Sequence, residues 1–272
     1  MNANPIPTSP ARFAETSAFA ALARAGYVAR GVIYAMIGLL AIRLALGVGT
    51  ARPSQQGAMS KIAHQPFGHA LLLLVAVGLG GYALWRFTQA LVGHTPEYGR
   101  HSKLDRLGAA GSGVAYAAFC ALAVSVLRGT AGDSSSKPRT TTAGVLHWPA
   151  GRELVGAAGI LFIVIAVYQA HLGVSKKFLR YSKTGEMSAS ALQAFTRIGI
   201  AGLVARAVAF ALIGIFVGKA ALDYRPREAV GIDGALVRLT NHTYGTAALV
   251  IVAAGLIAFG AYSIADARYR KI

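Results

Sequence analysis

The sequence predicts an all-α, polytopic membrane protein with six transmembrane helices, and its composition is the first reason. Of its 272 residues, 55% are hydrophobic and only 14% are charged, whereas about a quarter of an ordinary globular chain is charged. The second reason is that six apolar runs reach the ~20 residues that a helix needs to cross a bilayer. These predicted spans cover about residues 27–49, 70–92, 107–127, 154–174, 198–222 and 245–265.

The third observation is that one two-span unit occurs three times. RAGYVARGVIYAMIG from Arg24 aligns with RLGAAGSGVAYAAFC from Arg106 at an offset of 82 residues. GYVARGVIYAMIG from Gly26 aligns with GLVARAVAFALIG from Gly202 at an offset of 176 residues. The segments before the returning spans are also related, as GAMSKIAHQPFG, VLHWPAG and GALVRLTNHTYG. We therefore expect repeat 1 at residues 22–93, repeat 2 at 104–174 and repeat 3 at 195–265.

The repeat predicts how the helices are arranged. Because each copy contains two spans, all three copies enter the membrane from the same side, and such parallel repeats are known among transporters. We expect three parallel hairpins in a pseudo-threefold bundle. Between the two spans of a repeat lies a short segment with apolar residues at helical spacing, such as Met59 and Ile62. This spacing predicts short helices at the membrane surface.

The charges predict the orientation. The net charge is +17, and the 27 Lys and Arg lie mostly in loops between apolar runs. Sixteen fall on one side of the predicted membrane and eleven on the other, so the positive-inside rule places both termini in the cytoplasm. Residues 1–21 are expected to form a mobile cytoplasmic N-terminus. Neither a soluble basic domain nor a nucleic-acid motif is left over, so nucleic acid is not an expected partner.

These repeated motifs resemble those of a known family. A transmembrane hairpin that occurs three times, with R-G-x-x-Y at residues 30–34 and a return that begins P-F-G at 66–68, resembles the domain of unknown function 1206 family over roughly residues 22–265. The second copy lacks the arginine, and the third has Ala207 where the first has Gly31. The resemblance implies a multi-pass protein of the bacterial cytoplasmic (inner) membrane. It implies no activity, cofactor or site residue.

Two arginines in the first spans form the first candidate site. Arg30 and Arg206 occupy the same repeat position, where the second copy has Ser112. Tyr34 and Phe210 follow one helical turn later on the same face. One interpretation is that both arginines extend to the headgroups at the membrane edge. The alternative is that they converge inside the bundle, with Ser112 as the third member, and bind an anion or a lipid headgroup.

A basic segment directly after the fourth span is the second candidate. SKKFLRYSK at residues 175–183 contains four cations: Lys176, Lys177, Arg180 and Lys183. Such clusters attract anionic lipid by about 1 kcal/mol per cation. Membrane lipids, anionic ones included, are thus the expected partners, although marking of topology alone would also explain these cations.

The sequence shows no catalytic or metal-binding motif. No Asp or Glu lies in the middle of a predicted span, and His64 and His147 share one repeat position without further ligands. We therefore expect no enzyme activity, cofactor or metal. The interpretation favoured is a non-enzymatic membrane protein that binds lipid or protein partners. The alternative is a channel or transporter for a small anionic or amphiphilic solute through a central cavity.

Overall fold

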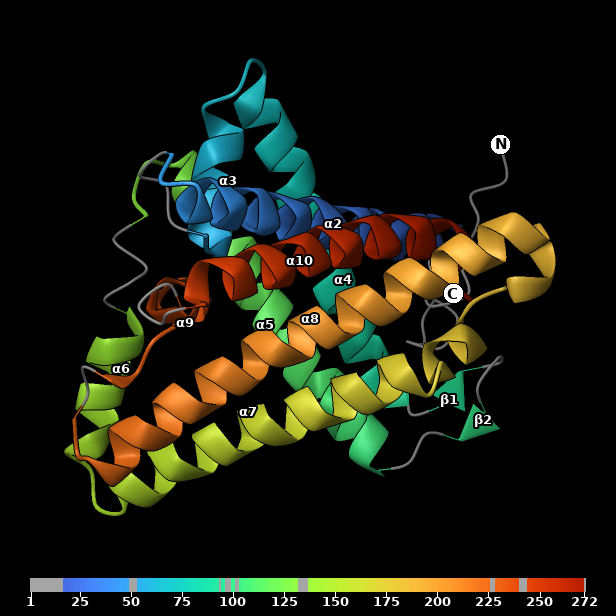
Figure 1. The fold of residues 1–272 in the computed structure, drawn as a ribbon. Coiled ribbons are helices and arrows are strands. Elements are labelled where there is room, and N and C mark those ends of the chain that lie inside the picture. The colour runs from blue at the N-terminus through green and yellow to red at the C-terminus, as the bar shows by residue number, and fades with distance from the viewer. Residues whose placement is uncertain are drawn as a thin grey trace.

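The computed structural model describes residues 17–48, 53–92, 94–95, 99–100, 103–131, 137–225, 228–239 and 244–271. Within these residues, six helices are long and apolar enough to cross a membrane. The all-helical class is thus confirmed, and the number of these helices agrees with the six predicted spans. They are α2 (Ser17–Ala45), α4 (Gly68–Val92), α5 (Lys103–Leu127), α7 (Gly151–Val174), α8 (Ala189–Leu222) and α10 (Gly245–Tyr269), shown in Figure 1. Of the predicted mobile N-terminus, residues 1–16 lie outside the described residues and 17–21 belong to α2.

Shorter elements connect the spans. A short helix lies between the two spans of each repeat: α3 (Gln55–Ala63), α6 (Lys137–Leu146) and α9 (Ile232–Leu239). Met59 of α3 and Leu236 of α9 are fully buried, so the apolar faces of these two helices pack against the protein. The remaining elements are the paired strands β1 (His94–Thr95) and β2 (Gly99–Arg100), and the 3₁₀ helices η1 (Lys177–Tyr181) and η2 (Thr184–Glu186).

The repeats use the same backbone geometry at their helix ends. Gly47 and Gly129, which follow the first spans of repeats 1 and 2, adopt φ of 67° and 68°. This left-handed conformation terminates a helix and is easiest for glycine. Before the returning spans, Phe67 and Ala150 adopt φ of 59° and 60°. Equivalent positions thus turn the chain in the same way in these two copies.

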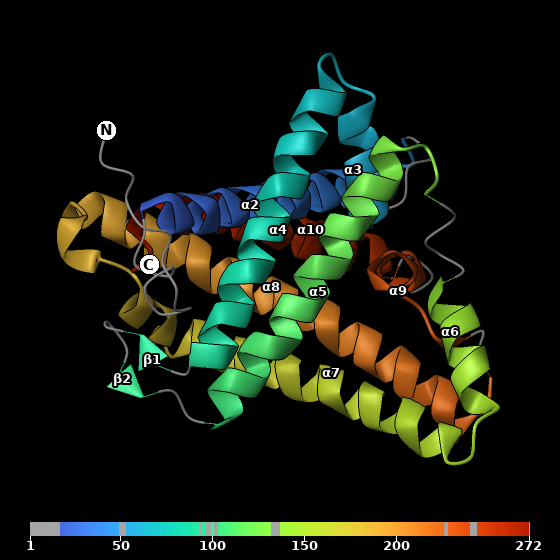
Figure 2. The ribbon, with the colours of Figure 1, turned by 180° about the vertical axis from the view of Figure 1, so that it is seen from behind.

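The six long helices associate as three antiparallel pairs. The pairs are α2 with α10, α5 with α4 and α8 with α7, so each joins the first span of one repeat to the returning span of another. Figures 1 and 2 show these pairs as layers, with α2 and α10 in the middle and α4 and α5 crossing them obliquely. Helix α2 begins and α10 ends at the same end of the molecule, which we call the terminal end.

The closed pseudo-threefold ring is not confirmed. Within repeats 1 and 3 the two spans pack together, as α2 with α4 and α8 with α10. Within repeat 2, the described residues of α5 and α7 do not form such an interface, and α5 and α7 are the least buried of the six helices. The helices therefore form a row in the order α5, α4, α2, α10, α8, α7. The row has the neighbours that a threefold ring requires, except for the contact between α5 and α7.

Glycines allow the pairs to approach closely. A side-chain carbon on Gly31 of α2 would lie 2.7 Å from the carbonyl oxygen of Gly260 on α10, and one on Gly260 would lie 2.7 Å from that of Gly31. On α8, a side-chain carbon at Gly202 would lie 2.5 Å from Phe259 Cα. Small residues that bring backbones together are typical of membrane helix packing, since water does not drive association there. This packing sets the positions of the two arginines.

Candidate functional site

Arg30 lies inside the bundle, at the contact between α2 and α10. The close approach at Gly31 puts the neighbouring Arg30 against α10, where its Nε donates to Ser263 Oγ at 2.7 Å. Its Nη1 donates to Tyr82 Oη of α4 at 3.2 Å. The Ser263 hydroxyl in turn donates to the carbonyl oxygen of Tyr27 at 3.1 Å. Only 8% of Arg30 is exposed, so it does not extend to the membrane edge.

Aromatic rings surround the buried guanidinium of Arg30. Its Cζ lies 4.6 Å from the ring centroid of Tyr27, 5.5 Å from that of Tyr82 and 5.3 Å from that of Phe259. Ring faces attract cations, and the attraction grows when the cation is removed from water. Hydroxyl groups and rings thus replace the solvation of this cation. It forms no ion pair with a described carboxylate.

Arg206 approaches the same aromatic cluster from α8. Its Cζ lies 4.9 Å from the ring centroid of Phe259, 5.2 Å from that of Tyr34 and 5.1 Å from that of Phe210. Phe259 therefore contacts both guanidiniums. In contrast to Arg30, Arg206 is only partly buried, and its Nε is buried without a hydrogen-bond partner. Three of the five residues predicted from the sequence thus contact the Phe259 ring, namely Arg30, Arg206 and Tyr34, and Phe210 contacts the guanidinium of Arg206.

The fifth predicted residue, Ser112, lies elsewhere on α5. Its neighbour Gly113 packs against the ring of Phe87 on α4, so this part of α5 lies at the α4 interface. Among the described residues, Ser112 forms no hydrogen bond with either arginine. Instead α5 contributes Tyr116, which the repeat alignment places at the position of Tyr34. The Tyr116 ring lies 4.4 Å from that of Tyr82.

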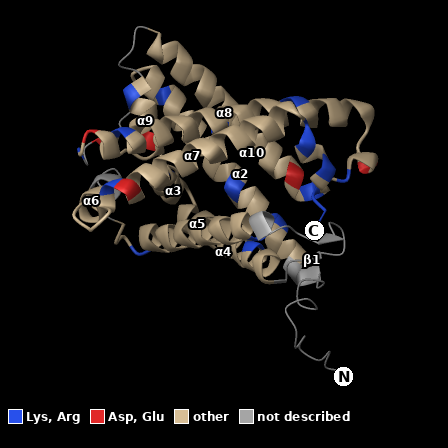
Figure 3. Cartoon of the chain, turned by 90° about the horizontal axis from the view of Figure 1, so that it is seen from below, with Lys and Arg blue, Asp and Glu red and all other residues tan. Residues whose placement is uncertain are grey.

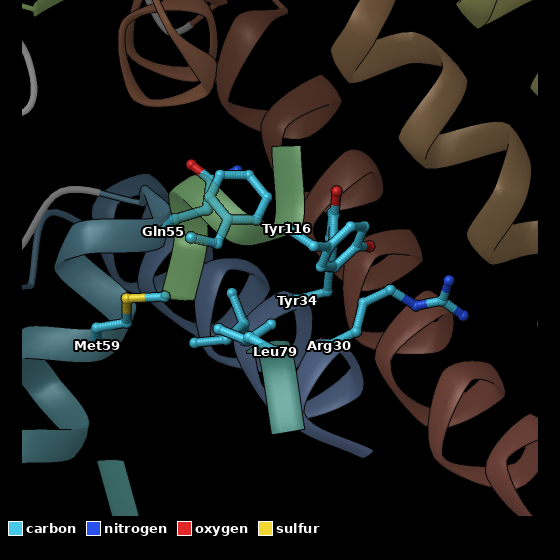
Figure 4. Close-up of a pocket in the computed structure, with 8 residues that line it drawn as sticks. Arg30, Tyr34, Gln55, Met59, Leu79 and Tyr116 are labelled. Atoms are coloured by element: carbon cyan, nitrogen blue, oxygen red, sulfur yellow. The ribbon is translucent and has the colours of Figure 1, made fainter. Parts of the chain in front are cut away.

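Tyr116 and Arg30 also line a small pocket between α2, α3, α4 and α5. Figure 4 shows it, with Tyr34, Gln55, Met59 and Leu79 among its other lining residues. The space measures about 220 Å³ and is in part open to the outside, and it has room for about one water molecule. In Figure 4 the Arg30 guanidinium points away from Met59 and towards α10. The hydroxyl of Tyr116 is buried without a partner.

Sequence reasoning missed the residues that complete the Arg30 environment. Ser263, Tyr82 and Phe259 lie in returning spans, which the alignment compared only at their beginnings. Extending that alignment would have placed a polar residue at the position of Ser263 in every returning span. The spatial pairing of α2 with α10 has no signal in the repeat, because sequence proximity favours pairing within a hairpin.

The basic segment at residues 175–183 folds against the terminal end. Phe178 is 1% exposed, and its ring lies 5.3 Å from that of Tyr262. Ser182 is also buried and donates to Asp266 Oδ1 at 2.9 Å. The predicted cations remain outside: Lys176, Lys177 and Arg180 are exposed. A buried phenylalanine thus holds three exposed cations next to the ends of α7, α8 and α10.

Lys183, the fourth cation of this segment, has a different environment. It is partly exposed and lies 3.6 Å from Glu186 Oε1. Nearby, Asp266 is fully buried and pairs with Arg270 at 3.3 Å. Figure 3 shows that the Lys and Arg of the described residues lie mostly towards the ends of the helices. No group of three His, Cys, Asp or Glu within the described residues is placed to hold a metal ion.

Comparison with known proteins supports the three repeats. The model of the family described as "Domain of Unknown Function (DUF1206)" matches the chain three times, at residues 25–93, 107–176 and 201–270. The chain is 34% identical over 251 residues to the uncharacterized protein YxxB of Bacillus subtilis (strain 168), which covers 92% of this chain and 90% of that protein. No solved structure matches the chain. The resemblance seen in the repeated hairpin is therefore confirmed: the chain belongs to the family of domain of unknown function 1206.

Proposed function

We propose that this protein is a non-enzymatic protein of the bacterial cytoplasmic membrane that binds anionic lipid at its terminal end, with both termini in the cytoplasm. The observation that carries the proposal is the fold of the basic segment. Because Phe178 is buried among aromatic rings, Lys176, Lys177 and Arg180 are held together at the ends of three spans, where we expect lipid phosphates to lie. A flexible loop would not hold its cations at a fixed depth.

The packing of the spans supports binding rather than passage. The glycine contacts at Gly31, Gly202 and Gly260 bring helix backbones together, which suits a packed core. The pocket beside Arg30 encloses about one water molecule, and a solute path needs a longer polar space. A channel or transporter for a small anionic or amphiphilic solute is therefore the second candidate.

The orientation can be tested directly. An even number of spans puts both termini on one side, and we expect that side to be the cytoplasm. A reporter that is active only in the cytoplasm should work when fused to either end and fail when inserted between α5 and α6. Activity at one terminus alone would contradict the arrangement of six spans.

Lipid binding can be tested with charge variants of the full chain. Replacing Lys176, Lys177 and Arg180 together by glutamine removes about 3 kcal/mol of attraction to anionic lipid, or on the order of 100-fold in affinity. The measurement is the rise in melting temperature of the detergent-solubilised protein as phosphatidylglycerol is added, with phosphatidylcholine for comparison. A saturating anionic lipid should raise the melting temperature by roughly 5–10 °C in the native protein.

A matched variant controls for the loss of three charges. Arg128, just after α5, and Lys219 and Arg225, at or just after the end of α8, are exposed cations at the opposite end of the molecule, and their replacement by glutamine should leave the rise with phosphatidylglycerol intact. Equal losses in both variants would show that net charge alone is responsible and would contradict a site at the terminal end. Equal rises with both lipids in the native protein would contradict anionic-lipid binding altogether.

A further inference from the structure

A polar residue occurs at one position of all three returning spans. Helices α4, α7 and α10 each begin at a glycine, and the residue 18 positions after that glycine is Arg86 in α4, Gln169 in α7 and Ser263 in α10. In the first spans, the position of Arg30 is polar in each copy as well. The three helix pairs therefore bring two sets of polar positions together, once per pair.

In the pair α2 with α10, these two positions are bonded to each other. Arg30 Nε donates to Ser263 Oγ at 2.7 Å, and that hydroxyl donates onward to a carbonyl oxygen. The polar groups of this pair satisfy each other inside the protein. The hydrogen bonds of this pair can therefore be compared with those at the same positions of the other two pairs.

In the pair α8 with α7, the equivalent residues are Arg206 and Gln169, and they lie at about the same level. A side-chain carbon on Gly173 of α7 would lie 3.0 Å from Leu203 Cβ of α8. The two helices are antiparallel, so a step of four residues towards the N-terminus of α7 matches a step of about four residues towards the C-terminus of α8. Gln169 thus lies at about the level of Arg206.

The two side chains also lie on the same side of this pair. Phe162 of α7 is two turns from Gln169, and Phe210 of α8 is one turn from Arg206. The rings of Phe162 and Phe210 lie 6.0 Å apart, so these two helix faces meet. Arg206 reaches past its own helix to Phe259, on the interior side of the row. An aromatic layer thus adjoins both polar groups.

Despite this placement, Gln169 and Arg206 have unused hydrogen-bonding groups. Gln169 is only 6% exposed, yet neither Nε2 nor Oε1 has a hydrogen-bond partner, and Arg206 Nε is buried and unpaired as well. A buried polar group without a partner is unfavourable, and the penalty is larger in the membrane interior. No described carboxylate pairs with Arg206. Two N–H donors and a cation that has ring contacts but no described carboxylate partner fit an oxyanion.

On one side of this place, the row of helices has no α5–α7 interface among the described residues. Helix α5 packs against α4 and forms no extensive interface with α7 or α8 among the described residues. Arg30, by contrast, lies between α2, α4 and α10. Because this side faces the predicted bilayer interior, the ligand that we expect there comes from the membrane and has an acyl chain.

We propose that Gln169 and Arg206 bind the anionic headgroup of a lipid that enters from the bilayer on the side where α5 and α7 do not pack together. The class of ligand rests on the proposed function, but the site is separate from the basic segment at residues 175–183. Arg206 supplies the charge, the Gln169 amide donates a hydrogen bond to a headgroup oxygen, and Phe210 and Phe259 flank the guanidinium.

The test counts lipids on the full-length protein by native mass spectrometry after exchange into detergent with phosphatidylglycerol. Gln169→Met keeps the length of the side chain but removes its amide, and Arg206→Gln removes the charge. Each variant should lower the fraction of protein that retains phosphatidylglycerol through delipidating washes by at least tenfold. Gln193→Met, the same change at an exposed position of α8, should have no effect.

Two further arms separate the alternatives. The variant with glutamine in place of Lys176, Lys177 and Arg180 should keep the lipid that survives washing, since that lipid lies at Gln169 and Arg206. Loss of this lipid only in that variant would overturn the inference and leave the proposed function standing. Undiminished retention of phosphatidylglycerol by Gln169→Met would also overturn the inference. So would an equal fall in the melting temperature of Gln169→Met with and without lipid, because the amide would then have a structural role. Stabilisation by sodium phosphate alone that equals that by phosphatidylglycerol overturns the lipid assignment.

Discussion

Gly260→Leu should abolish the folded protein or destabilise it by about 3 kcal/mol or more. A side-chain carbon at this position would lie 2.7 Å from the carbonyl oxygen of Gly31 and 2.9 Å from the backbone nitrogen of Ala35. Backbone atoms cannot move aside as a flexible side chain can, so α2 and α10 would have to separate, and overpacking of this kind is strongly destabilising. Separation would also break the bond between Arg30 and Ser263. Thermal unfolding followed by loss of monodisperse protein in detergent measures the effect.

The matched control is Gly111→Leu in α5. A side-chain carbon at Gly111 meets no atom within 4 Å, so the same added volume should change the melting temperature little. Equal tolerance of leucine at both positions would contradict the close approach of α2 and α10.

Phe259→Ala should cost about 3–5 kcal/mol, the range for removal of a fully buried aromatic side chain. Phe259 is 1% exposed and packs edge-to-face on Tyr34 with 4.8 Å between ring centroids. Its ring also contacts the guanidiniums of Arg30 and Arg206. Its removal would leave a cavity between two cations, and both lose a favourable contact. Chemical denaturation in mixed detergent and denaturant measures the change in unfolding free energy.

Tyr244→Ala provides the comparison, because this aromatic residue is 83% exposed at the start of α10. It should lower the unfolding free energy by less than about 0.5 kcal/mol, as surface substitutions usually do. Phe259→Leu should recover part of the loss, since the leucine fills most of the cavity but offers no ring face to the arginines.

The spans could be predicted from the sequence because the membrane requires long apolar runs, and all six predicted runs correspond to helices of the structure. Helix α2 begins at Ser17, ten residues before the predicted start of the first span at residue 27. The thickness of the bilayer sets the length of the apolar run, but the helix can continue beyond it. Helix α8 likewise begins before the predicted span, which starts at residue 198. The Ser188 hydroxyl caps this N-terminal extension by accepting a hydrogen bond from the backbone N–H of Ala191.

The arrangement of the spans was harder to predict. A repeat shows which positions are equivalent, but not which helices pack together. The strongest pairings join different repeats, and the described residues of α5 and α7 form no comparable interface within repeat 2, so the predicted closed ring is not confirmed. The glycines at 31 and 260 are visible in the sequence, yet only the structure shows that they face each other.

The candidate site could be predicted in part for the same reason. Arg30, Arg206, Tyr34 and Phe210 stood out because they recur on one helix face. The first three contact Phe259, and Phe210 contacts Arg206. Ser112 was expected to join them by symmetry, but its neighbour Gly113 packs against Phe87 of α4, and Ser112 forms no hydrogen bond with either arginine in the described part of the chain. Ser263 and Gln169 gave no local signal, because one serine or glutamine in an apolar span is as common in helix packing as in binding.

The central claim is that the protein binds anionic lipid, and its most direct test is the composition of the lipids that the protein retains. The native protein, reconstituted in nanodiscs with equal amounts of phosphatidylglycerol and phosphatidylcholine, is released in a mass spectrometer and its bound lipids are identified. We predict that phosphatidylglycerol exceeds phosphatidylcholine among the retained lipids by at least tenfold. Retention of the two lipids in the equal proportion in which they were supplied would contradict the claim.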